Sequence, residues 1–294
     1  MFKRVAIIGL GLIGGSLGLA LRQARAAQHL AGYDPGKGVG DRARKIGAID
    51  QSCSSLADAA RAAELIILAT PVGAMRSLLQ QLASLASPGA VVTDVASTKA
   101  QVISWAEEYL PPTIPFVGGH PIAGKEASGI ASADATLFKQ CIYSLTPTRH
   151  TSPAALQKVA TLIDVLGARV RFLEPPEHDG LVAGMSHLPF IASTALMQTV
   201  AGNPSWDDAS LLAGNGFRDM TRLAAGSPEM HRDICLTNSE AITRWLNEYI
   251  AVLSALRERI AAHDSNLGEV FEQAQKARNK WQDAQKEAKI REQK

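Results

Sequence analysis

The residues best placed to do chemistry are a histidine and a serine that follow two apolar runs. His120 stands in GGHPIAG (residues 118–124), which we expect to form a glycine-rich turn after a strand, and Ser97 stands in DVASTK (residues 94–99), after the strand before it. A histidine in such a turn can accept the proton of an alcohol while a hydride leaves the same carbon. A nearby hydroxyl can hold that alcohol or the imidazole in line. Taken alone, His120 would more often merely cap the turn, so the base role depends on a hydride acceptor nearby.

A nucleotide-binding pattern near the N-terminus supplies that acceptor. An apolar run at residues 5–8 leads into G-x-G-x-x-G, and an apolar helical pattern follows. Gly9 permits a tight turn, Gly11 lets the backbone approach a pyrophosphate, and Gly14 lets the helix pack on the strand. The N–H groups at the start of the helix attract the anion. The predicted cofactor-binding residues are Gly9, Gly11, Leu12, Ile13, Gly14 and Asp34, with Thr70 and Pro71 after a later strand.

Asp34 indicates which dinucleotide is bound. It ends an apolar run about 20 positions past the glycines, where a carboxylate accepts hydrogen bonds from ribose hydroxyls and repels a 2′-phosphate. This favours NAD over NADP. The basic residues between positions 37 and 45 leave NADP possible, because a 2′-phosphate would be held just past this strand.

Composition restricts the class of protein. The 294 residues, 46% hydrophobic and 20% charged, are typical of a globular chain with one large or two ordinary domains. The net charge of +2 calls for no nucleic acid or membrane partner. The three cysteines lie far apart, without metal-ligand spacing, which indicates a reducing compartment and no metal site. We therefore expect a cytoplasmic protein.

Two apolar segments could be mistaken for targeting or membrane signals. The N-terminus, with Lys3-Arg4 before an apolar run and Ala24-Arg25-Ala26 after it, superficially resembles a secretory signal. The regularly placed glycines and Asp34 favour the nucleotide site instead. The apolar segment at 181–202 carries several polar side chains and Pro189, so it fits a buried core helix better than a membrane span.

Strands and helices alternate up to about residue 173. The expected strands are 5–8, 29–34, 64–69, 90–95, 115–118, 141–145 and 169–173. This alternation predicts a doubly wound α/β domain with ligands at the carboxyl ends of its strands. Only helices are expected afterwards, at 177–202 (interrupted at Pro189), 206–213, 217–225, 228–262 and 267–291. We therefore divide the chain into a dinucleotide-binding domain (1–173) and an all-helical domain (174–294). The charged tail from Leu267 is predicted to form a solvated amphipathic helix, which lies on the surface or across a partner subunit.

Six motifs in this order resemble the prephenate/arogenate (cyclohexadienyl) dehydrogenases of tyrosine biosynthesis. They are GLGLIGGS (9–16), ATPV (69–72), DVASTK (94–99), GGHPIAG (118–124), SHLP (186–189) and GFRDMTR (216–222). The resemblance runs from Val5 to about Trp245. It implies a Rossmann-type domain followed by a helical dimerisation domain, and thus a homodimer. It also implies an NAD(P)-dependent oxidative decarboxylation, of arogenate to tyrosine, of prephenate to 4-hydroxyphenylpyruvate, or of both.

The resemblance also implies roles for individual residues. His120 matches the catalytic histidine that accepts the proton of the C4 hydroxyl while the C4 hydride moves to nicotinamide. Ser97 matches the serine that hydrogen-bonds with that hydroxyl and histidine. Arg218 matches the arginine that holds a substrate carboxylate, which a guanidinium fits in a bidentate way. Ser186 and His187 would line the substrate pocket from the helical domain.

Two positions depart from the family pattern. Phe190 stands where many relatives that use prephenate have a second histidine after SHLP, and Lys125 follows Gly124 where a small hydroxyl residue is common. Lys125 is therefore a further candidate for substrate binding. Both changes alter the contacts that the protein would make with the side chain of the substrate, a keto acid in prephenate or an amino acid in arogenate. The choice between prephenate and arogenate stays open, with arogenate or dual use favoured.

Other interpretations of these residues remain. Arg218 could form an interdomain ion pair, and His187 could be an ordinary core histidine. A β-hydroxyacid or pyrroline-carboxylate-type NAD(P) oxidoreductase would share the glycine loop and a helical second domain, but the hydroxyacid group relies on a lysine in the helical half. A non-catalytic NAD-binding protein would tolerate the loss of His120. The presence of both His120 and Arg218 argues against it.

Overall fold

The computed structural model describes residues 1–125 and 127–292. The chain separates into two compact units, Met1–Ile242 and Thr243–Lys294. The first unit contains the sheet, the helices that cover it and a group of shorter helices. The second consists of two long helices. All the residues predicted to do chemistry belong to the first unit.

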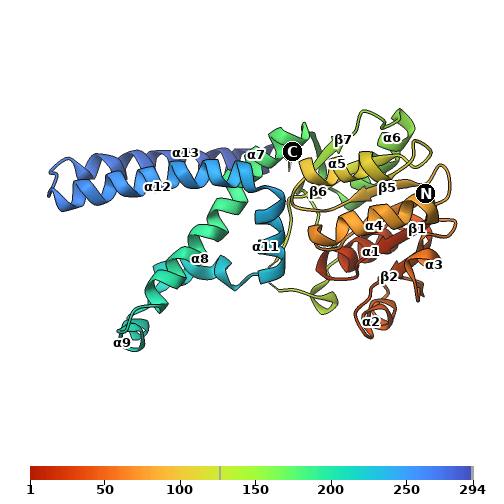
Figure 1. Ribbon diagram of the computed structural model, residues 1–294, viewed down its shortest axis with the longest axis horizontal. Helices are drawn as coiled ribbons and strands as arrows, with labels where there is room; N and C mark the ends of the chain where they lie inside the picture. The colour runs from red at the N-terminus through yellow and green to blue at the C-terminus, as the bar shows by residue number, and fades with distance from the viewer. Residues whose placement is uncertain (126, 293–294) are drawn as a thin grey trace. The chain divides into compact units, whose positions relative to one another are not determined.

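The first unit is built on a mostly parallel sheet (Figure 1). In the part of the chain that is described, the sheet has 8 strands in the order β3-β2-β1-β4-β5-β6-β7-β8. Their bounds are β1 (Phe2–Ile8), β2 (Ala27–Tyr33), β3 (Gln51–Ser52), β4 (Leu65–Leu68), β5 (Val91–Asp94), β6 (Phe116–Pro121), β7 (Ile142–Pro147) and β8 (Arg169–Phe172). Neighbouring strands are parallel except for β6 and β7, which are antiparallel. The strand order reverses between β1 and β4, which is where such sheets bind their ligands.

Helices cover both faces of this sheet. They are α1 (Leu12–Gln23), α2 (Val39–Lys45), α3 (Leu56–Ala60), α4 (Val72–Leu85), α5 (Ala100–Tyr109) and α6 (Pro153–Leu166). Alternate residues of β1 point to opposite faces. Val5 and Ile7 therefore join the buried cluster that contains side chains of α1 and α6, whereas Ala6 and Ile8 join the cluster that contains side chains of α4 and α5. The predicted fold class, a doubly wound domain followed by helices, is confirmed.

The helices that follow belong partly to the first unit. They are α7 (Pro175–Val182), a π-helical turn (Ala183–His187), α8 (Leu188–Ala201), α9 (Trp206–Leu211), α10 (Asn215–Thr221), a 3-10 turn (Arg222–Ala225) and α11 (Pro228–Thr237). α7 packs on α5, and α11 packs on α4. Asp233 Oδ2 of α11 accepts a hydrogen bond from the Gly73 backbone N–H in the first turn of α4, over 3.1 Å. The predicted domain boundary after residue 173 coincides with the change from strands to helices, and it stays a prediction.

The helix boundaries differ from expectation at two places. The interruption predicted at Pro189 is the π-helical turn before it, and Pro189 itself lies in the first turn of α8, where a missing N–H is tolerated. The helix predicted over 228–262 is in fact two helices, because Asn238 separates α11 from α12 (Ser239–Ala261). Both breaks lie beside the residues described in the next section.

The run Pro175–Ala201 is long and apolar enough to cross a membrane by length and hydropathy alone. Several of its polar side chains are bonded within the protein, however. The buried Ser193 accepts a hydrogen bond from the Ala224 N–H, and the buried Asp179 accepts two from the backbone before and at the start of α5. These contacts fix part of the run inside the protein, as expected of a core helix, although most of its residues are not buried in the single chain.

The second unit is a helical hairpin. It contains most of α12, a turn, and α13 (Leu267–Glu292), and the two helices lie side by side in Figure 1. Arg259 closes the turn, because its Nε donates to Asp264 Oδ2 over 2.6 Å and its Nη2 donates to the Asn266 carbonyl over 2.9 Å. Large apolar side chains, among them Ile250, Leu253 and Phe271, remain exposed in the single chain.

Candidate active site

The glycine loop joins β1 to α1 at the point where the strand order reverses. Gly9 has a φ of +92°, and a Cβ on Gly14 would lie 1.9 Å from the Gly9 carbonyl oxygen, so a side chain at either position would disrupt the turn. A Cβ on Gly11, in contrast, would meet no atom within 4 Å. The backbone at Gly11 thus faces open space at the N-terminus of α1. This is the space and the polarity that a pyrophosphate requires.

The other predicted cofactor residues surround this loop. The Asp34 carboxylate follows β2 and accepts hydrogen bonds from the N–H groups of Leu10 and Gly36, each over 2.8 Å. Thr70 and Pro71 connect β4 to α4, and the Thr70 methyl group would lie 2.9 Å from a Cβ on Gly9. The structure therefore brings Asp34, the glycine loop and Thr70 to one edge of the sheet. These residues fit a dinucleotide.

His120 lies in β6 and not in a turn. The prediction of a turn is wrong because β6 continues through Pro121, and His120 pairs with Ser144 of β7. The residue before it must be small, since a Cβ on Gly119 would lie 2.7 Å from the Asp94 carbonyl oxygen. The position of His120 is therefore fixed by its pairing with β7 and by the close contact of Gly119 with β5.

The His120 ring is joined to a second histidine that the sequence analysis did not identify. His120 Nδ1 lies 2.8 Å from His178 Nε2, and the two rings meet edge-on at 69° with centroids 5.1 Å apart. Burial lowers the pKa of His120 well below its usual value, and His178, Lys99 and His187 lower that pKa further because they oppose another positive charge. A neutral imidazole is the form that can accept a proton.

Asp179 holds His178 from the other side. Its Oδ1 accepts from His178 Nδ1 over 2.8 Å and from the Lys99 N–H over 2.7 Å, and its Oδ2 accepts from the Ala100 N–H over 2.9 Å. The Lys99 and Ala100 N–H groups belong to the start of α5, where a carboxylate is stabilised by the free N–H groups and the helix dipole. Asp179 therefore caps α5 from α7 and orients His178 at the same time.

A buried ion pair lies behind this cluster. Lys99 and Asp94 are both without solvent exposure, and Lys99 Nζ bonds to Asp94 Oδ2. The other Asp94 oxygen accepts from the Gly119 N–H over 3.0 Å, so the pair also fixes the backbone next to His120. Burial lowers the pKa of Lys99, while Asp94 and Asp179 act in the opposite direction.

His187 lies in the π-helical turn, and its ring is held by Asn238. The Asn238 side-chain amide donates to the Asp179 carbonyl over 2.9 Å and lies 3.2 Å from His187 Nδ1. His187 is 1% exposed, and within the residues described its Nε2 is buried without a hydrogen-bond partner. Burial lowers the pKa of His187 to about 4. Because the amide N–H donates to Nδ1, the neutral ring carries its proton on Nε2 and offers a free donor.

The remaining predicted site residues lie in more open surroundings. Ser97 is partly exposed in the connection from β5 to α5, and Ser186 is exposed beside His187. Lys125 lies on the loop after β6, where its ammonium group pairs with Asp134 over 2.7 Å. Arg218 is exposed on α10, a helix that packs on α8. The roles in substrate binding of Ser186, Lys125 and Arg218 stay predictions, as does that of Ser97 in orienting the hydroxyl.

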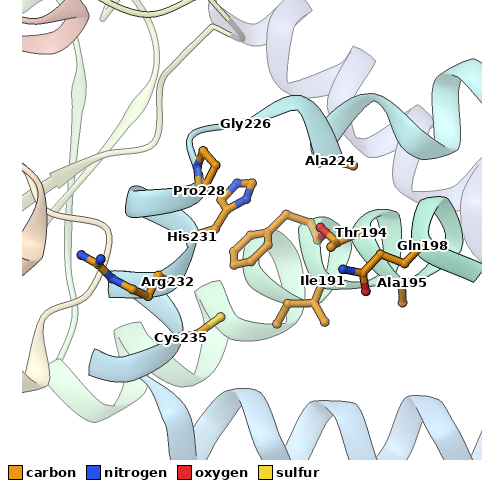
Figure 2. A pocket seen from close by; sticks show the side chains of 11 residues that line it. Ile191, Thr194, Ala195, Gln198, Ala224, Gly226, Pro228, His231, Arg232 and Cys235 are labelled. Carbon is orange, nitrogen blue, oxygen red and sulfur yellow. The ribbon is translucent and has the colours of Figure 1, made fainter. Parts of the chain in front are cut away.

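A mainly apolar cavity lies between α8 and α11 (Figure 2). Its volume is about 390 Å³. His231 and Cys235 of α11 face Thr194 and Gln198 of α8 across it, and Arg232 lines its rim with its guanidinium group pointing away from α8. Phe190, which stands where a second histidine was expected from the family resemblance, forms one wall. Its ring stacks on His231 at 4.1 Å and lies 6.0 Å from the His187 ring.

The fold and the site together define a dinucleotide-dependent oxidoreductase: a Rossmann-type sheet with a partly buried histidine, of lowered pKa, at the carboxyl end of β6. Residues 17–172 match the family described as prephenate dehydrogenase, nucleotide-binding domain, and residues 174–274 match prephenate dehydrogenase, dimerization domain. The chain belongs to the prephenate dehydrogenase family. The resemblance drawn from its six sequence motifs is confirmed.

Individual relatives agree with this assignment. The chain is 35% identical to the prephenate dehydrogenase of Bacillus subtilis, over 95% of this chain and 76% of the relative. It is also 35% identical to the cyclohexadienyl dehydrogenase of Zymomonas mobilis, over 95% and 96%. The crystal structure of prephenate dehydrogenase from Aquifex aeolicus, in complex with hydroxyphenyl propionate and NAD+, superposes with a TM-score of 0.88 at 31% identity, over 95% of this chain and 98% of that one.

Proposed function

We propose that the protein catalyses the NAD-dependent oxidative decarboxylation of a cyclohexadienyl acid, arogenate or prephenate, in the tyrosine pathway. The observation that carries this proposal is the contact of His120 Nδ1 with the buried His178 Nε2 over 2.8 Å, which leaves His120 Nε2 to face a substrate. Family membership supports the class of reaction, and the pairing of His120 with His178 supports His120 as the residue that accepts the proton.

In this proposal, different residues of the chain transfer the proton and orient the substrate. Bound NAD supplies the acceptor for the hydride that leaves C4 of the substrate. His120 Nε2 accepts the proton of the C4 hydroxyl, and Ser97 orients that hydroxyl. The C4 oxygen thereby becomes a carbonyl, the ring loses CO2 and becomes aromatic, and the proton returns from His120 to the oxygen or to solvent. Because aromatisation drives the loss of CO2, the protein need only position the ring.

Two groups are proposed to hold the far end of the substrate. The His187 Nε2–H is a buried donor with no partner in the described part of the chain, and a carbonyl or carboxylate oxygen of the substrate would satisfy it. Arg218 is proposed to bind a carboxylate through its guanidinium fork. Phe190 and Lys125 would then affect whether the side chain is a keto acid or an amino acid, and we favour arogenate or dual use.

The cofactor and the assembly are part of the same proposal. Asp34 supports NAD over NADP, because its carboxylate lies against the glycine loop where the ribose would bind. The match to a dimerization domain and the exposed apolar side chains of α12 and α13 support a homodimer, and the three widely spaced cysteines support a reducing compartment such as the cytoplasm.

Steady-state kinetics tests the function directly. Purified protein is assayed for reduced nicotinamide with arogenate and prephenate, each with NAD and NADP, and with a panel of 3-hydroxyacids as control. Turnover of at least one cyclohexadienyl acid, with the hydroxyacids inert, is the expected result. Reduction of NAD only by the hydroxyacids, or by no compound in the set, would overturn the proposal.

A further inference from the structure

We infer that His178 and Asp179 are positioning residues that hold His120 in the one tautomer able to act as a base. This inference rests on the proposed function and adds the two residues that prepare His120 for it. The three side chains form a continuous chain: Asp179 Oδ1 lies 2.8 Å from His178 Nδ1, and His178 Nε2 lies 2.8 Å from His120 Nδ1. The chain crosses from α7 to β6.

The direction of each hydrogen bond follows from the carboxylate at its end. Both oxygens of Asp179 already accept from backbone N–H groups, those of Lys99 and Ala100. A backbone N–H can only donate, so Asp179 acts as an acceptor throughout and His178 Nδ1 must donate to it. A neutral His178 then has its lone pair on Nε2. His120 must therefore donate from Nδ1, which leaves the lone pair of His120 on Nε2, where the substrate hydroxyl binds.

The surroundings favour a neutral His120 ring before the reaction. His178 has no solvent exposure and Asp179 is 4% exposed, and the charged or titratable groups that face the cluster are Lys99, Asp94 and His187. Lys99 is balanced by its pair with Asp94, so Asp179 is the carboxylate left to balance a charge on the histidines. When His120 takes up the substrate proton, the positive charge is stabilised through His178 by Asp179. The proton stays on His120, as in an Asp–His pair that orients a base.

The position of Asp179 is itself fixed by the fold. Lys99, at the N-cap of α5, provides no side-chain cap of its own, and Asp179 supplies the cap from another helix. The carboxylate is therefore held by backbone groups that do not take part in the reaction. The Asp179 carbonyl also accepts from Asn238, whose amide orients His187. Asp179 thus connects a proton acceptor, His120, with a proton donor, His187.

Nitrogen NMR of the free enzyme tests the tautomer without any turnover. The full-length protein is labelled with 15N-histidine, and spectra of His120→Asn and His178→Gln identify the two rings. We expect His120 to carry its proton on Nδ1 with Nε2 unprotonated, and His178 to carry its proton on Nδ1. A proton on His120 Nε2, or a doubly protonated His178, would overturn the inference. Because no substrate is added, this result is independent of whether the proposed function is correct.

Kinetics of two His178 variants provides the second test. His178→Leu removes the acceptor for His120 Nδ1, and kcat should fall by roughly 10²–10⁴-fold with the affinity for NAD unchanged. His178→Gln offers an amide oxygen to His120 and should recover at least about 10-fold of that loss. Equal kcat values for the two variants, or a Gln variant as active as the wild type with its His120 tautomer altered, would contradict the inference. If the Leu variant does not fold, the Gln variant and its NMR spectrum decide the question.

Discussion

Asp94 links the buried ammonium group of Lys99 to the backbone of Gly119, the residue before His120. One carboxylate oxygen bonds to Lys99 Nζ and the other accepts from the Gly119 N–H over 3.0 Å. Neither charged side chain is exposed. Removing one member of such a pair leaves the other charge buried and uncompensated, which is far more costly than removing both.

Lys99→Met should therefore destabilise the protein strongly. We expect the free energy of unfolding to fall by about 3–5 kcal/mol, because the Asp94 carboxylate would be left without its counter-charge in the core. Urea denaturation of wild type and variant measures the change. Lys276→Met, which removes an exposed pair with Glu272 on α13, is the matched control and should have little effect. A Lys99 variant as stable as that control would show that the pair is not needed for folding.

His120→Asn should remove the base without removing the cofactor site. Turnover should fall by roughly 10²–10⁴-fold, since an amide cannot accept the substrate proton in the transition state. NAD affinity, measured by titration, should be unchanged because the glycine loop is formed by other strands. The exposed His150, near the start of α6, gives the control His150→Asn, for which normal turnover is expected. Normal turnover of His120→Asn would instead exclude His120 as the base.

The parts of this site that could be predicted are those indicated by the spacing of residues within short stretches of the sequence. The glycine turn, Asp34 and the strand ends at Thr70 and Ser97 follow from spacing along a few residues, so their meeting at one edge of the sheet could be predicted. His120 was identified for the same reason, although the predicted turn was wrong. The β7 residues that pair with β6 lie far along the chain, and only they show that the strand continues through Gly119 and His120.

The partners of His120 could not be predicted in this way. His178 is 58 positions away from His120, and periodicity does not tell which polar side chains of a later helix will meet a given strand. A signal was present: adjacent His178 and Asp179 stand after two prolines, just before a very apolar run. The break at Asn238 also had a signal, since Asn-Ser-Glu is typical of a helix end followed by a new start. Its purpose, to bond Asp179 and His187, is visible only in three dimensions.

Arg218→Gln should weaken substrate binding more than cofactor binding. The neutral amide loses the charge-assisted, bidentate bond to a carboxylate, so the apparent KM for the cyclohexadienyl acid should rise by at least about 10-fold. The Kd for NAD should stay the same. Arg257→Gln, at an exposed position on α12, serves as the control. If KM and the Kd for NAD changed equally, Arg218 would have a structural role and not a role in substrate recognition.

Asp34 should determine the preference for NAD. Wild-type protein is expected to have a higher kcat/KM with NAD than with NADP, because the carboxylate accepts from the ribose hydroxyls and repels a 2′-phosphate. Asp34→Asn should reduce the ratio of the two values through loss of the negative charge. Measuring kcat/KM for both cofactors at a fixed substrate concentration tests this. A wild-type enzyme that uses NADP more efficiently would show that the nearby basic residues dominate.

The low pKa of His187 should make stability depend on pH in a defined range. The folded protein holds this group with a pKa of about 4, whereas an unfolded histidine titrates near about 6.5. Between these values the unfolded chain binds the proton and the folded chain does not. The contribution of His187 to stability is therefore fully present above about pH 6.5 and is lost as the pH falls toward about 4. Urea denaturation of wild type and His187→Gln across this range measures it: the wild type should lose stability relative to the variant on acidification. Parallel curves would mean that His187 is charged, or exposed to water, in the folded protein.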